Sequence, residues 1–167
     1  MPKNGIFIGR FQPFHKGHQA VIEKIMNDGL KPIVIVGSVN STDNSRNPYS
    51  FDQVKKMITS VFPDIVCLPL PDYQDDMKWL SHLRSIIPCE SVIYYFRKDE
   101  DLKNGVHYLD FLDGKIELRE INSDEINIPV RATQIRSNYE RFKLFLPSSV
   151  YQIMINCDKH KLAEMKK

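Results

Sequence analysis

The sequence lacks the features of disulfide-rich and metal-binding proteins. Its 167 residues include only three cysteines, Cys67, Cys89 and Cys157, which stand far apart and form no CxxC or Cys/His spacing. An odd and scattered set argues against a disulfide framework or a zinc site, and it favours reduced thiols in a cytoplasmic protein. A chain of this length buries roughly 70% of its unfolded surface, so a hydrophobic core suffices to hold it.

Long apolar runs and a strong charge of one sign are also missing. No run approaches the ~20 apolar residues of a membrane helix, and the N-terminus leads straight into a short apolar segment, so we expect neither a membrane span nor a signal peptide. The net charge of +2 is too small for the basic face of a nucleic-acid-binding protein. We expect no nucleic-acid or membrane partner, while homo-oligomerisation stays open. The basic residues near the C-terminus are typical of a solvated helix end: Lys159, His160, Lys161, Lys166 and Lys167.

Short apolar runs alternate with segments of helical periodicity along the whole chain. The runs predict buried strands over residues 5–8, 32–36, 65–68 and 91–96, and a half-exposed strand over 115–120. The periodic segments predict helices over 18–27, 51–62 and 79–87, and a closing helix from about residue 147. This alternation predicts one α/β domain, residues 1–167, with a Rossmann-like, doubly wound parallel sheet. Ligands of such sheets bind at the C-terminal ends of the strands.

A dense group of polar residues follows the first expected strand, in the segment GRFQPFHKGH at residues 9–18. Gly9 lets the backbone turn off the strand and approach a ligand closely. Arg10 carries a permanently charged fork of donors that suits phosphate, and Lys16 adds a second cation. The helix that follows contributes free N–H groups and a partial positive charge at its N-terminus. The segment therefore predicts a triphosphate-binding loop.

Two histidines lie in the same segment at a helical spacing. His15 and His18 are three residues apart, so both rings should lie on one side of the helix start. Gly17 between them removes a side chain where a phosphate would approach. A metal site is the alternative, but zinc sites need three or four ligands and no third one stands nearby. We expect the pair to bind phosphate and expect no metal ligands.

A second polar segment, PVRATQIR at residues 129–136, lies near the C-terminus. Thr133 can cap a helix there and offer its hydroxyl to phosphate oxygens. Arg136, one turn further on, can form a forked pair of hydrogen bonds with the same phosphates. Alone, the pattern also suits an ordinary capped helix. Together with the first segment, it favours a second half of one phosphate site.

The segment GRFQPFHKGH resembles the HxGH signature of the nucleotidyltransferase superfamily. It is most similar to the nicotinamide-mononucleotide adenylyltransferases of the archaeal type and to the adenylyltransferase half of bacterial enzymes fused to a Nudix hydrolase domain. Residues 129–136 resemble the second motif of these families. Residues 46–51 and 72–79 resemble the segments that surround the second nucleotide. The resemblance extends from about residue 6 to about residue 154 and includes no Nudix signature.

The resemblance implies transfer of AMP from ATP to nicotinamide mononucleotide, giving NAD and pyrophosphate, with Mg²⁺ carried by the ATP phosphates. It implies catalytic roles for His15, His18, Arg10, Lys16 and Arg136. It implies ATP binding by residues of both motifs, namely Ile8, Gly9, Arg10, Phe11, His15, His18, Thr133, Gln134, Ile135 and Arg136. It implies that the mononucleotide is bound by Arg46, Asn47, Trp79 and Lys98.

Trp79 illustrates how two interpretations of one residue compete. Its flat ring suits a pyridinium cation by cation–π attraction. Its spacing to Leu83 and Ile86 is equally typical of a residue in a helix core. Both roles stay open from the sequence.

Four residues at three places depart from the pattern of the relatives. Val54 stands where they usually have arginine, Tyr95-Phe96 stand where they have Gly-His, and Ala132 stands where many have serine. These departures bear on the second substrate more than on the ATP site. Two alternatives therefore stay open. One is a related transferase with another acceptor, such as nicotinate mononucleotide, a flavin precursor or phosphopantetheine. The other is a nucleotide-binding regulator without turnover.

Overall fold

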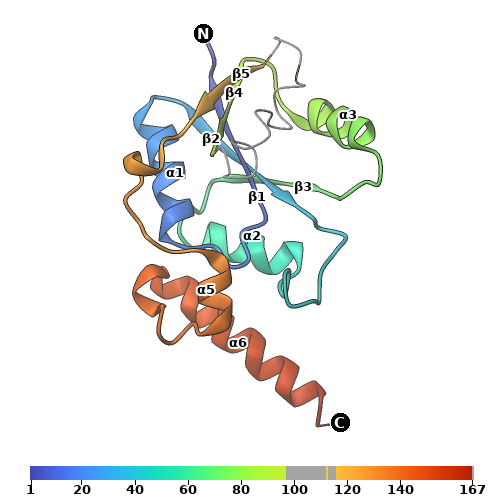
Figure 1. Ribbon diagram of the computed structural model, residues 1–167, viewed down its shortest axis with the longest axis vertical. Helices are drawn as coiled ribbons and strands as arrows, with labels where there is room; N and C mark the ends of the chain where they lie inside the picture. The colour runs from blue at the N-terminus through green and yellow to red at the C-terminus, as the bar shows by residue number, and fades with distance from the viewer. Residues whose placement is uncertain (97–111, 113–115, 167) are drawn as a thin grey trace.

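The computed structural model describes residues 1–96, 112 and 116–166, and these contain a five-stranded sheet (Figure 1). Its strands are β1 (Asn4–Gly9), β2 (Lys31–Gly37), β3 (Val66–Leu70), β4 (Ser91–Tyr95) and β5 (Glu117–Glu120). All neighbouring strands pair in parallel, in the order β3-β2-β1-β4-β5. The order reverses beside β1, so the expected doubly wound parallel sheet is confirmed, and the loop after β1 lies at the switch point.

Helices connect the strands and end the described chain. They are α1 (Lys16–Asn27), α2 (Phe51–Thr59), α3 (Asp76–Ile86), α5 (Ala132–Ser137) and α6 (Ser148–Glu164), with 3-10 turns at η2 (Ser123–Glu125) and η3 (Lys143–Phe145). The expected helices are confirmed, but their ends differ. α1 begins at Lys16 because His15 caps it. α2 ends before the expected Phe62 because its last turn tightens: the N–H groups of Val61 and Phe62 both donate to the carbonyl of Ile58, at 3.1 and 2.9 Å.

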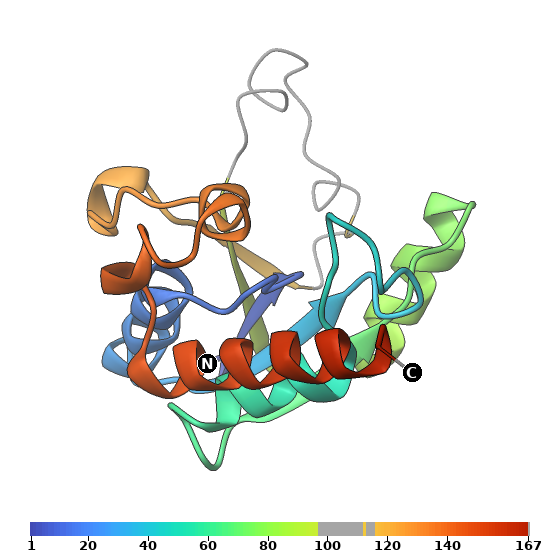
Figure 2. The same cartoon turned by 90° about the horizontal axis from the view of Figure 1, so that it is seen from below.

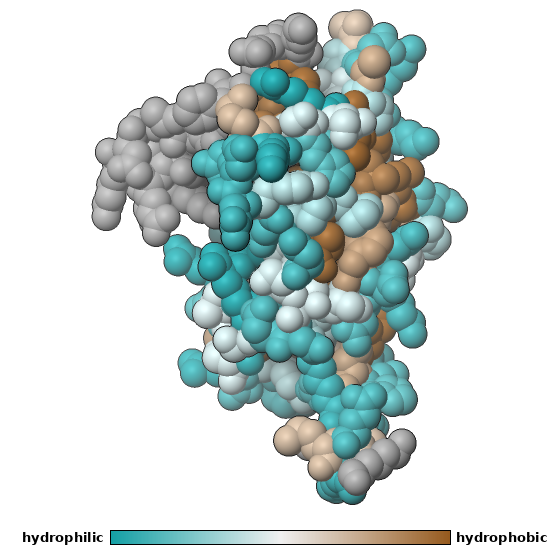
Figure 3. Space-filling view, turned by 90° about the vertical axis from the view of Figure 1, so that its right-hand side faces the viewer, coloured by the Kyte–Doolittle hydropathy of each residue, from teal (hydrophilic) through white to brown (hydrophobic). Residues whose placement is uncertain are grey.

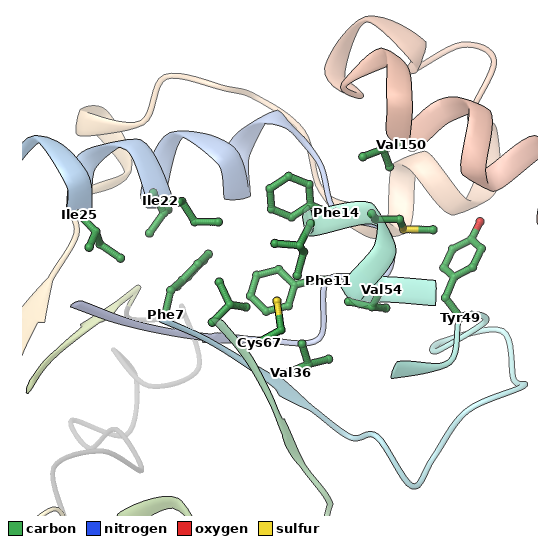
Figure 4. Packing of buried hydrophobic residues seen from close by; sticks show 14 of the residues in the cluster. Phe7, Phe11, Phe14, Ile22, Ile25, Val36, Tyr49, Val54, Cys67 and Val150 are labelled. Atoms are coloured by element: carbon green, nitrogen blue, oxygen red, sulfur yellow. The ribbon is translucent and has the colours of Figure 1, made fainter. Parts of the chain in front are cut away.

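The strands bury both of their faces. On β2, Val34 and Val36 point into one hydrophobic cluster, which includes residues of α1, α2 and α6. Ile33 and Ile35 point into another, which packs against α3. Figure 4 shows the first cluster, where aromatic rings fill the space between α1, α2 and the sheet. Because both faces are covered, β2 has the continuous apolar sequence of a buried parallel strand.

The C-terminal helices lie at one end of the molecule. Figures 1 and 2 show α5 and α6 together there, with α6 running beside α2. Val150 and Met154 of α6 are buried in the first cluster. The hydroxyl of Ser149 lies 2.8 Å from that of Ser60, at the end of α2. α6 is therefore fixed on α2 by apolar packing and by a hydrogen bond. None of the helices that the structure describes has the length and apolar character to cross a membrane.

β3 forms one edge of the sheet. Val66 is exposed on this strand, and Pro69 has no N–H to offer to a further strand. Figure 3 faces the side on which α3 lies and shows apolar side chains gathered in a limited area between polar ones. A proline in a short edge strand limits pairing with other chains.

Candidate active site

The N-terminus of α1 brings the two histidines of the first motif together. His15 is the N-cap, and its Nδ1 accepts a hydrogen bond from the backbone N–H of Gly17 at 3.1 Å. The Nδ1 of His18 accepts one from the backbone N–H of His15 at 3.3 Å, which completes a reciprocal cap. The rings stack with their centroids 3.7 Å apart and their planes inclined by 24°. The expectation that both rings lie on one side of the helix start is confirmed.

These hydrogen bonds determine which nitrogen of each neutral ring carries the proton. A neutral imidazole has one nitrogen that donates and one that accepts. Because Nδ1 of both His15 and His18 accepts a backbone N–H, the proton of each ring is on Nε2. The helix start therefore holds two imidazole N–H donors whose tautomer is set by the backbone itself.

Burial lowers the pKa of both histidines. The pKa of His15 falls to about 4 because its ring is withdrawn from water. The pKa of His18 lies well below its usual value, first because of burial and then because of the charge of His15. The ring of His18 stands against those of Phe11 and Phe14, with centroid distances of 4.8 and 5.8 Å. Both histidines are consequently neutral donors at neutral pH.

Gln12, in the loop after β1, holds that loop against the segment before α2. Its Nε2 donates to the carbonyl of Tyr49 at 2.8 Å, and its Oε1 accepts from the N–H of Tyr49 at 2.9 Å. The Gln12 side chain is buried, so both of its polar ends need these partners. From the sequence we assigned no role to Gln12 and missed this structural one. The signal available was a polar residue between two aromatic ones in a segment that must be buried.

Arg136 joins the two sequence motifs. Its Nη1 donates to the carbonyl of Gln12 at 2.6 Å, and its Nη2 donates to Oγ1 of Thr133 at 3.3 Å. The expectation that Thr133 caps α5 was wrong. The helix begins at Ala132, and its cap is Arg131, whose N–H donates to Oε1 of Gln134 at 2.8 Å. Thr133 lies inside the first turn instead, where its hydroxyl accepts from Arg136.

Three guanidinium groups come from three separate segments of the chain. Burial and then the charges of Arg46 and Arg136 lower the pKa of Arg10, which Asp72 partly offsets. Burial and then the charge of Arg46 lower the pKa of Arg136. The positive charges of Arg10, Arg46 and Arg136 therefore act on one another. Positive charge concentrated in this way, beside neutral N–H donors and the exposed Lys16, suits a ligand with several negative charges.

The other residues expected at the ATP site differ in how much side chain they expose. The side chains of Phe11 and Ile135 are fully buried, so only their main chain is open to a ligand, whereas Gln134 is exposed. Ile8 is partly buried and packs on the second cluster, beside α3. A Cβ on Gly9 would lie 2.9 Å from the Phe11 ring, so this position has no space for a side chain.

The residues expected at the second nucleotide differ in their burial and surroundings. Arg46 is exposed, whereas Asn47 is buried and its Nδ2 donates to the carbonyl of Ser41 at 2.8 Å. Trp79 is partly buried and packs on the second cluster, as its helical spacing suggested. Lys98 lies outside the described residues.

The three departures from the relatives' pattern lie in different surroundings. Val54 is fully buried in the first cluster, where an arginine would have no solvent. Tyr95 ends β4, and Phe96 is partly buried beside the same cluster. Ala132 is the first residue of α5, which begins beside an open hollow of about 700 Å³. The hollow is lined by Ile128, Pro129, Val130, Arg131, Thr133 and Gln134.

Gly17 offers a test of the histidine geometry. A Cβ at this position would lie 2.9 Å from Cε1 and 3.0 Å from Nδ1 of His15. We expect Gly17→Ala to displace the His15 ring and to slow the expected nucleotidyl transfer about tenfold, because small misplacements of catalytic groups are costly. Alanine is otherwise the better helix former, so the melting temperature should change little. A variant with the wild-type rate would show that the position of this ring does not matter.

The sheet and the site together define an α/β domain with a cluster of arginine and imidazole groups at its switch point. The chain belongs to the cytidylyltransferase-like family, whose model matches residues 6–138. Within that family it is similar to the nicotinamide-nucleotide adenylyltransferase of Methanoculleus marisnigri, with 34% identity over 94 residues, which are 54% of this chain and 56% of the relative. The match thus spans about half the length of that curated relative.

Solved structures share the fold over most of the chain. A bifunctional NMN adenylyltransferase/ADP-ribose pyrophosphatase from Francisella tularensis has a TM-score of 0.72 and 26% identity, covering 95% of this chain and 50% of that one. Another structure of that description, complexed with AMP and an Mn ion, has a TM-score of 0.66 and 22% identity over 100% of this chain and 57% of that one. The expected resemblance to these families is confirmed.

Proposed function

We propose that the protein is an adenylyltransferase that moves AMP from ATP to nicotinamide mononucleotide. The observation that carries this proposal is the hydrogen bond of 2.6 Å between Nη1 of Arg136 and the carbonyl of Gln12, which joins the two motifs into one site. The second support is the similarity to nicotinamide-nucleotide adenylyltransferases. The third is the concentration of positive charge beside the stacked histidines.

The reaction requires positioning more than covalent help. An oxygen of the mononucleotide's 5′-phosphate attacks the α-phosphorus of ATP, and the bond from that phosphorus to the bridging oxygen breaks and releases pyrophosphate. Negative charge grows on the phosphate oxygens as this bond breaks. Donors that already point to these oxygens stabilise the transition state without reorganising. No protein nucleophile is needed.

Each group of the site has a role in this mechanism. The Nε2–H groups of His15 and His18 donate to the phosphate oxygens around the scissile bond. Arg10, Lys16 and Arg136 neutralise the β- and γ-phosphates. The backbone of residues 8–11 and 133–135 contacts the rest of ATP. Arg46, Asn47, Trp79 and Lys98 are the proposed contacts of the second nucleotide.

Mg²⁺ is the proposed metal, carried by the ATP phosphates. Among residues 1–96, 112 and 116–166, no group of three or more His, Cys, Asp or Glu could hold a metal ion. Mg²⁺ needs no such group, because it often keeps its waters and binds chiefly through the phosphates of its substrate. When bound, it would neutralise charge on the phosphates.

The direct test is to incubate the protein with ATP, Mg²⁺ and nicotinamide mononucleotide and to follow NAD and pyrophosphate. We expect equal amounts of both products, and we expect chelation of Mg²⁺ to stop the reaction. Nicotinate mononucleotide, a flavin mononucleotide and phosphopantetheine serve as parallel acceptors. Turnover with one of these alone would replace the proposed acceptor. Binding of ATP by calorimetry without turnover of any acceptor would instead identify a nucleotide-binding regulator.

A further inference from the structure

The C-terminal helix reaches the segment that carries Arg46. The Nζ of Lys161, on α6, donates to the carbonyl of Pro48 at 2.9 Å and lies 3.6 Å from Oδ1 of Asp43. The Asp43 side chain is 86% exposed, so the ion pair contributes little. The hydrogen bond to the Pro48 carbonyl is the contact that can fix the segment, because a charged donor makes a stronger bond than a neutral one.

α6 is itself fixed where Lys161 leaves it. Cys157, one turn earlier, accepts a hydrogen bond at its Sγ from Nε2 of Gln53 on α2, at 3.4 Å. Met154 is buried a further turn back. Figure 2 shows α6 running past α2 toward the loop between β2 and α2. Lys161 therefore extends from a rigid support and not from a fraying helix end.

The segment is held from the opposite side as well. Gln12 makes its paired hydrogen bonds with the backbone of Tyr49, directly after Pro48. Figure 4 shows the Tyr49 ring beneath the C-terminal helices, with its hydroxyl directed toward them. Asn47 is buried, so the chain is fixed from residue 47 to residue 49. Arg46 is the residue immediately before this fixed stretch, and its position depends on both supports.

We propose that Lys161 is a positioning residue, which holds the Pro48 carbonyl so that Arg46 joins Arg10 and Arg136 in one anion site. Gln12 connects the segment of Arg46 with the other two arginines: its side chain binds the backbone of Tyr49, and its carbonyl accepts from Arg136. The charge of Arg46 also lowers the pKa of Arg10 and Arg136. Lys161 acts through Arg46 and does not touch the ligand. The anion is a nucleotide's phosphate chain only if the proposed function holds, but the site itself can be tested without turnover.

The test is a double-mutant cycle measured with inorganic tripolyphosphate by calorimetry. Lys161→Met keeps most of the side-chain length and removes the ammonium. We expect it to weaken tripolyphosphate binding by roughly tenfold, the size of one lost charge-assisted hydrogen bond. Arg46→Ala should weaken binding at least as much. The double variant should be no weaker than Arg46→Ala alone, because Lys161 acts only through Arg46. Lys161→Arg should restore most of the affinity.

Lys159→Met, an exposed lysine on the same helix, is the matched control and should bind like the wild type. Equal binding of tripolyphosphate by Lys161→Met and the wild type would overturn the proposal. It would also be overturned if the losses in affinity of the two single variants multiplied in the double variant. The same proteins are then assayed for NAD formation. If the double variant binds no more weakly than Arg46→Ala but no NAD forms, only the proposed function is refuted. If NAD forms but the two substitutions weaken binding independently, only the role of Lys161 is refuted.

Discussion

His18→Ala is expected to slow NAD formation by roughly 10²–10³-fold, because it removes a fixed N–H donor from the phosphates as charge develops on them. The loss should fall on kcat more than on the KM for ATP, since the donor matters most in the transition state. The imidazole is already oriented for this proposed role in the protein without ligand. Its Nδ1 is occupied by the His15 backbone N–H, and its ring is enclosed by Phe11 and Phe14.

The variant also removes half of a helix cap, so a control must separate the two roles. Glutamine suits this position of a reciprocal cap, because its side-chain oxygen can accept the His15 N–H. His18→Gln should therefore keep the melting temperature of the wild type and still lose at least about tenfold in rate. Full recovery of the rate by glutamine would show that the imidazole is not required, because the glutamine amide can supply both the cap and an N–H donor. A near-wild-type rate in His18→Ala would refute the catalytic role altogether.

Most of the fold could be predicted from local patterns. Continuous apolar runs such as residues 32–36 identify strands that are covered on both faces, and the structure shows Val34 and Ile35 in opposite clusters. Helix ends were predicted less well, because they depend on hydrogen bonds of single residues. His15 starts α1 earlier than periodicity indicates. The bond from the Arg131 N–H to Gln134 moves the cap of α5 away from Thr133, where a hydroxyl suggested it.

The site could be predicted only where its residues are close in sequence. The three-residue spacing of His15 and His18 predicts that their rings lie on one side of the helix, where they stack. The bonds that assemble the rest of the site leave no local pattern, because their partners are 37 residues apart for Gln12 and Tyr49 and 124 apart for Arg136 and Gln12. Their energy depends on a sheet that must form first. The role of Lys161 was hidden for the same reason, within a run of basic residues that resembled a solvated helix end.

The protein without ligand is expected to lose stability as the pH falls from about 6.5 to about 4, and His15 should account for much of the loss. The pKa of His15 is about 4 in the folded state, against 6.5 for the ordinary side chain. Between these values the unfolded chain binds the proton and the folded one does not, so acid favours unfolding. Above pH 6.5 the ring is neutral in both states and contributes no slope. At pH 4 the accumulated loss is about 3 kcal/mol of unfolding free energy.

His15→Asn isolates this effect. Asparagine is a good N-cap whose side-chain oxygen can accept the Gly17 N–H, and it does not titrate. The carboxylates are the same in both proteins, so they largely cancel in the difference. His18 does not cancel fully, because the charge of His15 helps to lower its pKa; without that charge the variant should lose slightly less stability in acid. Urea unfolding at pH 7, 6, 5 and 4 should show the wild type losing about 3 kcal/mol more than His15→Asn. Parallel pH profiles would contradict the buried, neutral state of this ring.

A bound anion should reduce the loss of stability at low pH, and this connects the stability measurement to the site. Negative phosphates beside Nε2 favour the charged imidazole and raise the pKa of His15 and His18. Binding of tripolyphosphate near pH 5 should therefore take up protons, which calorimetry detects by repeating the titration in buffers of different ionisation enthalpy. His15→Asn should take up fewer protons than the wild type. If uptake is the same in both proteins, the anion does not lie against His15, and the phosphates must bind to the arginines alone.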